Sequence, residues 1–155
     1  MNHIVRAIPL PAESLLHQRR RTGDFLDCFS VAADLPPRQA AEIITNFPAW
    51  VKALLKIRGL LVAPFGLSKE GPNARDKLGP FPVDSASDTE IIAGFNDRHL
   101  DFRVSVMSRN GQVSLATWVR RHNLGGRLYL ALIMPFHIAV ARNALARVAR
   151  AAQPR

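Results

Sequence analysis

Cysteine is nearly absent from this chain of 155 residues, which contains only Cys28. A single cysteine cannot form an intramolecular disulfide, and without a second one there is no CxxC pair for redox chemistry or zinc. We therefore expect a reducing compartment, by default the cytoplasm. A chain of this length buries enough surface to fold without a metal or a disulfide, and we predict no metal site and no cofactor.

Long apolar runs are missing as well. The longest, ALIMPF and LLVAPF, are far shorter than the roughly 20 residues that cross a bilayer, and each contains a proline. Residues 1–23 hold short apolar pieces such as AIPLP, followed by HQRRR, and lack the apolar core and cleavage site of a secretory signal. The sequence therefore predicts a soluble protein with no transmembrane segment and no export signal.

Acidic residues are fewer than basic ones. The chain has 12 Asp and Glu against 21 Lys and Arg, which gives a formal net charge of +9. Such a chain attracts anionic partners, nucleic acid and membranes among them. The arginines are scattered, however, and no aromatic residues alternate with them as a stacking platform for single strands requires. We expect no specific nucleic-acid binding.

The sequence motifs of the common enzyme classes are also absent. The chain contains no GxSxG, no HExxH and no glycine-rich phosphate loop. No catalytic residue is predicted from a motif, and isolated carboxylates capable of acid–base chemistry leave the question of enzyme activity open.

What the sequence does contain is a clear order of helix and strand patterns. We expect a polar N-terminal arm at 1–23 and a single domain at 24–152. Glycine, proline and charge predict a long surface loop at 64–80. Alternating apolar residues predict strands at 24–34, 81–85, 89–95, 100–108 and 113–121. Helical spacing and breaks at proline predict helices at 38–47, 49–63 and 123–151, the last capped by Asn123 and kinked at Pro135.

The stretch NDRHLDFRVSVM, residues 96–107, mixes charged residues with a strand pattern. Alternation places Phe102 and Val104 on a buried face, and puts Asp101 and Arg103 on a wetter face, where we expect cross-strand charge pairs. The functional alternative is that Asp101 orients His99 at the mouth of a cavity. The following RNGQ predicts a two-residue type I′ hairpin turn, and Trp118 is an exception to the alternation of the second strand.

Four sequence blocks, DFLDCF, GFNDRHLDFRVSV, NLGGRLYL and MPFH, resemble those of the bacterial family known as domain of unknown function 2867. The element order resembles the helix-grip architecture of START-like, polyketide-cyclase-like (SRPBCC) proteins. This resemblance implies an α+β fold in which a curved antiparallel sheet wraps around the long C-terminal helix. It also implies an apolar cavity for lipids, polyketides or other hydrophobic small molecules, lined by Trp50, Phe102, Val104, Leu115, Tyr129, Ile133 and Phe136.

Because about five strands are evident where larger helix-grip proteins have seven, a core filled by its own side chains is the alternative to a cavity. On a helical wheel, His137 lies beside the stripe that contains Ile133 and Phe136. It is expected to be either a boundary histidine bonded to the scaffold or the polar contact that orients a ligand.

Three functions compete on this basis. The first is binding of a hydrophobic small molecule or lipid in the cavity. The second is a cyclase or dehydratase-type enzyme, in which His99, Tyr129 or His137 transfers a proton in the same cavity. The third is a basic interaction module that uses the C-terminal ARNALARVARAAQPR on an anionic surface. The sequence predicts no particular oligomeric state.

Overall fold

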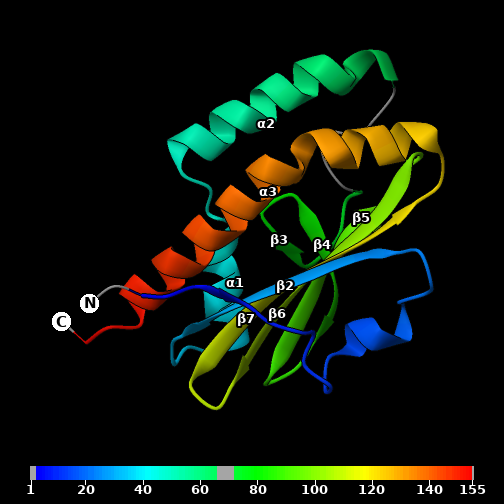
Figure 1. Cartoon of the computed structure of the whole chain (residues 1–155). Coiled ribbons are helices and arrows are strands. Elements are labelled where there is room, and N and C mark those ends of the chain that lie inside the picture. Colours follow the sequence, from blue (N-terminus) through cyan, green and yellow to red (C-terminus); the bar gives the residue numbers. More distant parts are fainter. Residues whose placement is uncertain (1–2, 66–71, 155) are drawn as a thin grey trace.

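The structure is a computed structural model that describes residues 3–65 and 72–154. Its fold is α+β, with a curved antiparallel sheet of seven strands in the order β1-β2-β7-β6-β5-β4-β3 and a long C-terminal helix across one face (Figure 1). The predicted helix-grip architecture is therefore confirmed. We call the face of the sheet toward this helix the inner face and the opposite one the outer face.

Five strands of six to ten residues form most of the sheet, and they match the strands predicted from alternation. They are β2 (Phe25–Ala32), β4 (Phe81–Ala86), β5 (Glu90–Asn96), β6 (Leu100–Arg109) and β7 (Gln112–Arg121). The edge strands β1 (Arg6–Ala7) and β3 (Lys77–Leu78) have two residues each, which is too short for alternation to reveal them. At the β6–β7 turn, Asn110 and Gly111 have φ angles of 52° and 70°, as the predicted type I′ hairpin requires.

Within the described residues, three α-helices and two short 3₁₀ helices complete the fold. They are α1 (Pro37–Thr45), α2 (Ala49–Val62), α3 (Leu124–Ala151), η1 (Leu15–Gln18) and η2 (Ala63–Phe65). Pro37 occupies the first turn of α1, where no backbone donor is needed. The loop predicted at 64–80 lies partly on residues 66–71, outside the described residues, and its far end contributes β3.

The long helix α3 begins where the sequence predicts. The Asn123 side chain accepts a hydrogen bond from the backbone N–H of Gly126 at 2.9 Å, which satisfies one donor of the first turn. Pro135 lies inside the helix and removes a backbone hydrogen bond. Figure 1 shows α3 changing direction about midway along its length, as the predicted kink requires.

The inner face is packed more tightly at one end of α3 than at the other. Under the C-terminal half, Ala141, Ala144, Leu145, Val148 and Ala149 are buried in one cluster with β2, β6 and β7. Under the N-terminal half, Leu130 is buried against Leu100 and Val119, whereas Tyr129 and Ile133 are only partly buried. The helix therefore packs closely on the sheet at the C-terminal end of α3 and less closely at its N-terminal end.

The outer face is covered by the N-terminal segment, which the sequence predicts as a polar arm. Leu16 of η1 is 0% exposed and packs with Cys28, Ile92 and Trp118. Burial raises the pKa of the Cys28 thiol to about 12, with a further contribution from the nearby Asp27 charge. The segment is fastened through Glu90, whose carboxylate accepts bonds from the Ser14 hydroxyl at 2.6 Å and the Leu15 N–H at 3.0 Å.

Alternation puts Arg103 on a wetter face of the sheet, but the structure buries it, so this expectation is wrong. Arg103 is 6% exposed, and its guanidinium donates to Asp84 at 2.5 Å, to Asn96 at 3.0 Å and to the carbonyl of Phe102 at 2.8 Å. Phe102 and Val104 face inward as predicted but are half-buried. The ion-pair partner of Arg103 on β6 is therefore Asp84 on β4, two strands away, and not a residue directly across from it on a neighbouring strand.

We therefore expect Arg103→Ala to destabilise the fold by about 2 kcal/mol, because it removes a buried guanidinium together with its three hydrogen bonds. Arg19 also contacts Asp84 at 2.8 Å, and this second ion pair limits the loss. Urea unfolding compares the variant with Arg98→Ala, an exposed arginine whose removal should cost little. Equal midpoints for the two variants would contradict the role that the contacts give Arg103.

Candidate functional site

One histidine–aspartate pair lies between the sheet and α3. Asp27 is on the inner face of β2, and His137 projects from α3 with its Nε2 2.9 Å from Oδ2 of Asp27. The two side chains are 21% (His137) and 19% (Asp27) exposed. The other carboxylate oxygen, Oδ1, is buried and has no hydrogen-bond partner among the described residues. A buried carboxylate oxygen normally has a partner, so this atom marks the pair as a candidate site.

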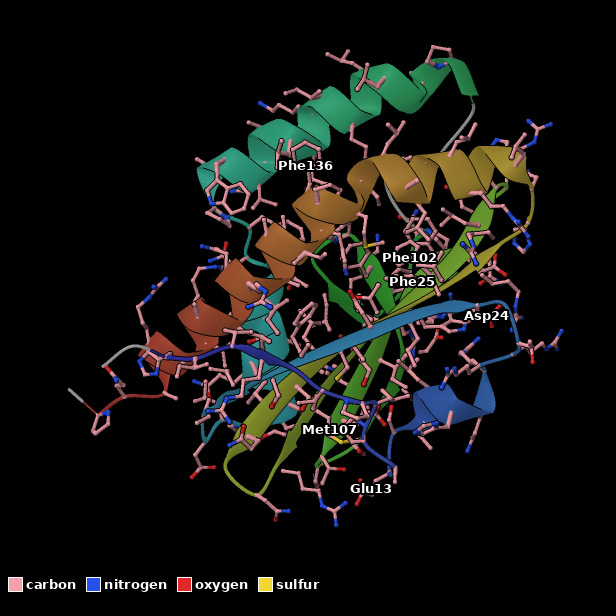
Figure 2. All side chains as sticks on the ribbon, viewed as in Figure 1. Glu13, Asp24, Phe25, Phe102, Met107 and Phe136 are labelled. Carbon is pink, nitrogen blue, oxygen red and sulfur yellow. The ribbon has the colours of Figure 1, made fainter. Side chains whose placement is uncertain are left out.

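A row of mostly aromatic side chains lies beside the pair on the inner face of the sheet. The strand register aligns Phe25, Val119, Phe102 and Phe95 in one row across four strands. The Phe25 ring meets His137 edge-on, with 6.3 Å between centroids, and Phe102 meets Phe95 in a similar way at 4.7 Å. Figure 2 shows Phe25 and Phe102 beneath α3, on the side of the helix that faces the sheet. The polar pair is thus set in apolar surroundings.

The second helix contributes a cation at the edge of this region. Arg58 of α2 donates from Nε to the Tyr129 hydroxyl at 2.5 Å, and its guanidinium carbon lies 5.4 Å from the centroid of the Tyr129 ring. Such stacking and hydrogen bonding hold α2 beside the N-terminal half of α3. Arg58 therefore joins the two helices next to the loosely packed end of the inner face.

Of the nine residues predicted for the site, six lie between the sheet and α3, although not all at the Asp27–His137 pair. These six lie on the inner face or on the side of α3 that meets it: Phe102, Val104, Leu115, Tyr129, Ile133 and His137. Leu115 is deeply buried in the core under the C-terminal half of α3 rather than near the Asp27–His137 pair.

Three predicted residues lie elsewhere. Phe136 is 53% exposed, on the side of α3 turned away from the sheet, because it is about 100° from His137 around the helix (Figure 2). Trp50 is 42% exposed in the first turn of α2. His99 lies beside the start of α3, where its Nδ1 is 2.9 Å from the side-chain nitrogen Nδ2 of Asn123.

The sequence suggests Asp101 as a partner of His99, and the structure shows Asp101 in contact with a different histidine. Asp101 instead contacts Nε2 of His122 at 2.8 Å, because β7 brings His122 opposite the start of β6. This second histidine–aspartate pair lies outside the space between α3 and the sheet, and the His122 side chain is 38% exposed. It provides a natural comparison for the interior pair.

Sequence reasoning missed Asp27 and Arg58 as site residues. The signal for Asp27 was available, since it occupies an inward position of a strand whose neighbours on that face, Phe25 and Phe29, are aromatic. A carboxylate among such residues needs a partner. Arg58 carries no comparable signal, because a charged residue on a helix is most often on its solvated side.

A separate hollow of about 790 Å³ lies on the outer face, beside the N-terminal segment. It is wide open to solvent, and its lining includes Arg109, which forms an ion pair with Glu13, and Met107. Figure 2 shows Glu13 and Met107 on the side of the sheet away from α3. Glu13 and Arg109 in this lining are engaged with each other, whereas the inner-face site has a buried carboxylate oxygen without a partner, so we take the inner-face site as the better candidate.

The inner-face site offers a hydrogen-bond acceptor to a ligand. The free Oδ1 of Asp27 is available to accept a hydrogen bond from a ligand, while Oδ2 is engaged by His137. Over residues 3–65 and 72–154, no group of three or more histidine, cysteine or acidic residues could hold a metal ion. The chemistry available is that of a hydrogen-bond acceptor, or a carboxylate-oriented imidazole, in apolar surroundings.

The sheet, the gripping helix and the enclosed polar pair define an α+β protein of the helix-grip type. A family model described as protein of unknown function (DUF2867) matches residues 20–144. The chain belongs to this family, as its sequence blocks predict. No curated protein and no solved structure matches the chain.

Proposed function

We propose that the protein binds a hydrophobic small molecule or lipid between the inner face of the sheet and the N-terminal half of α3. The observation that carries this proposal is the buried, unpartnered Oδ1 of Asp27. A ligand that donates a hydrogen bond to this oxygen would remove the cost of leaving it unpaired. The resemblance to START-like proteins, which hold such molecules at this place, supports the same function.

The packing around Asp27 supports an apolar ligand. Phe25, Phe102 and Ile133 are only partly buried, although they lie on surfaces that face each other. Covering these side chains with a ligand would bury further apolar area, at roughly 25 cal/mol per Å². A mostly apolar region with one oriented polar group is the usual composition of a small-molecule site.

The polar end of the ligand follows from the charge of Asp27. A carboxylate accepts hydrogen bonds and repels other anions, so the site favours a hydroxyl or an amine over a carboxylate. The proposed ligand class is therefore an apolar molecule with a hydrogen-bond donor, for which a long-chain alcohol is a simple probe and the fatty acid of equal length a matched comparison.

Asp27→Ala is expected to weaken binding of the long-chain alcohol about 10-fold to 100-fold, because a hydrogen bond to a charged group contributes about 1.5–3 kcal/mol. Displacement of the neutral fluorescent probe N-phenyl-1-naphthylamine measures the affinity. Asp101→Ala is the matched control, since it removes the aspartate of the exposed His122 pair and should leave affinity unchanged. Thermal unfolding of each variant shows that the folds are comparable.

The result that would overturn the site is equal alcohol affinity in the unchanged protein and in a folded Asp27→Ala variant. Tighter binding of the fatty acid than of the alcohol would reject the donor preference. Native mass spectrometry of the protein purified from cells provides a test without a chosen probe, because a retained molecule is identified by its mass. Loss of that molecule in Asp27→Ala but not in Asp101→Ala is the expected outcome.

An enzyme of the cyclase or dehydratase kind is the second candidate, favoured by the hydrogen bond between Asp27 and His137. A carboxylate that orients an imidazole is a common arrangement for general acid–base catalysis. The same mass spectra separate binding from dehydration. A dehydratase predicts that the molecule retained by His137→Gln is heavier by one water than the molecule retained by the unchanged protein, whereas a binding protein retains the same molecule in both.

A further inference from the structure

The face of α3 turned away from the sheet is apolar and exposed along the N-terminal half of the helix. Leu124, Leu128, Leu132 and Phe136 follow one another at four-residue steps, and each is 53–74% exposed. Residues four apart on a helix lie on one side of it. This stripe is opposite Gly126 and Leu130, which are buried against the sheet.

Helix α2 extends the same kind of surface. Its Ile57, Leu60 and Leu61 are 53–76% exposed, and Arg58 holds the helix beside α3 through Tyr129. Figure 1 shows α2 running alongside α3, on the side away from the sheet. Single exposed leucines are ordinary, but a group of this size on neighbouring helices marks an interaction surface. We call these seven side chains the apolar helix face.

The charges on these two helices are all of one sign. Neither α2 nor α3 contains an aspartate or glutamate, although the chain has 12 acidic residues elsewhere. Lys52, Lys56 and Arg127 are exposed on the same two helices. Leucine and phenylalanine combined with lysine and arginine, without acidic residues, is the composition of helices that lie in the interface of an anionic bilayer.

We propose that the apolar helix face docks the protein on the surface of an anionic lipid bilayer. Charge complementarity selects this partner over a second copy of the chain, because two such faces brought together would place cations of both copies against each other. The proposal does not depend on the interior ligand site, since no residue of the apolar helix face contacts Asp27 or His137 in the bonds described above.

The protein would lie on the bilayer rather than cross it. By length and composition alone α3 includes a stretch apolar enough to span a membrane, and only 17% of that stretch is buried. The C-terminal half of the same helix packs in the core, where Ala144, Leu145 and Val148 are buried. A helix fixed to the sheet along one side presents only its other side to lipid.

This location differs from the anionic-surface hypothesis drawn from the sequence, which placed the contact at the C-terminal ARNALARVARAAQPR. There the apolar residues are buried, and Arg147 donates to backbone carbonyls of Ile43, Ile44 and Asn46 at the end of α1. That arginine caps a helix, and the large apolar residues of this segment, Leu145 and Val148, are buried in the core instead of facing lipid.

Vesicle co-sedimentation of the full chain tests the proposal. We expect at least about tenfold more bound protein on phosphatidylcholine vesicles that contain about 30% phosphatidylglycerol than on phosphatidylcholine alone, because each basic residue near an anionic surface adds to the attraction. Leu60→Glu with Leu132→Glu should reduce binding to the anionic vesicles about tenfold or more. Ile4→Glu, at a similarly exposed residue of the N-terminal segment, is the matched control and should bind normally.

Three outcomes would overturn the proposal. One is equal binding of the double variant and the Ile4→Glu control. Another is equal binding to neutral and anionic vesicles, which would remove the charge argument. The third is a concentration-dependent dimer, seen by analytical ultracentrifugation, that the double variant abolishes while vesicles bind no protein. The two leucines are 74–76% exposed, so unchanged thermal unfolding of the double variant is expected and keeps a loss of lipid binding interpretable.

Discussion

Gly94→Ala is expected to destabilise the fold by about 3–5 kcal/mol, close to the stability limit of many domains of this size. Gly94 lies in the middle of β5 with a φ angle of +147°, a conformation that only glycine adopts readily. A Cβ atom there would be 2.3 Å from the carbonyl oxygen of Phe102 and 3.1 Å from Cδ of Arg103. Neither the strained backbone nor the overlap with a neighbouring strand can be relieved locally.

The physical reason is the path of the Arg103 side chain. Arg103 is on β6 and Asp84 is on β4, so the guanidinium has to pass over the intervening β5. It crosses at Gly94, its direct partner in the strand register. A side chain at residue 94 would displace the arginine from Asp84 as well as pushing the strands apart.

Urea unfolding measures the loss, and Gly23→Ala is the control that separates the two effects. Gly23 also has a positive φ angle, +91°, but nothing lies within 4 Å of the position of its Cβ atom. We expect Gly23→Ala to cost about 1 kcal/mol from backbone strain alone. If Gly94→Ala lost no more stability than Gly23→Ala, the close crossing of Arg103 over β5 would be contradicted.

Trp118→Ala is expected to cost about 3–5 kcal/mol, the usual range for removing a fully buried aromatic side chain. Trp118 is 2% exposed on the outer face, packed against Leu16 and Ile92. Its indole N–H donates to Asp24 at 3.0 Å, and the Arg120 guanidinium lies 5.0 Å from its ring centroid. Its loss would leave a cavity and release the N-terminal segment from the sheet.

The other tryptophan supplies the control for this prediction. Trp50 is 42% exposed on α2, and Trp50→Ala should cost less than about 1 kcal/mol. Each variant leaves one tryptophan, so fluorescence and circular dichroism together follow the unfolding of both. Similar unfolding midpoints for Trp118→Ala and Trp50→Ala would show that the outer face does not form a second core.

A milder variant, Trp118→Phe, tests the hydrogen bond through its pH dependence. Burial acts to raise the pKa of Asp24, but hydrogen bonds from Arg120, the Arg21 N–H and Trp118 outweigh burial and hold that pKa below its ordinary value. A lowered folded-state pKa stabilises the fold above the unfolded pKa, and this contribution is lost as pH falls through the folded pKa. The stability difference between Trp118→Phe and the unchanged protein should therefore be largest near neutral pH and shrink in acid.

The strands and helices of this protein follow from short-range patterns in the sequence. Alternation predicts β5, β6 and β7. The Asn110–Gly111 pair predicts the hairpin between β6 and β7, and Asn123 predicts the start of α3. These features depend on side-chain period and local backbone preference, which act over a few residues. For the same reason, the inward direction of Phe102 and Val104 was predictable.

The cover of the outer face depended on tertiary contacts. Asp101 and Arg103 have the spacing of solvent-facing residues, and nothing nearby in the sequence indicates that Leu16 and Ser14 will pack on that face. Ser14 and Glu90 are 76 positions apart, so their hydrogen bond depends on how the whole sheet is assembled. A polar strand residue is exposed or buried according to what lies across from it, which alternation does not report.

The candidate site also depends partly on short-range sequence patterns and partly on tertiary contacts. The sequence by itself determined that His137 lies beside an apolar stripe of α3 and that Asp27 sits among inward aromatic residues, because both depend on helix and strand period. Only the tertiary structure decided that these two side chains, 110 positions apart, form a hydrogen bond. It also turned Phe136 and the leucine stripe away from the sheet, since one side of a helix can pack against a single layer and the opposite side stays exposed.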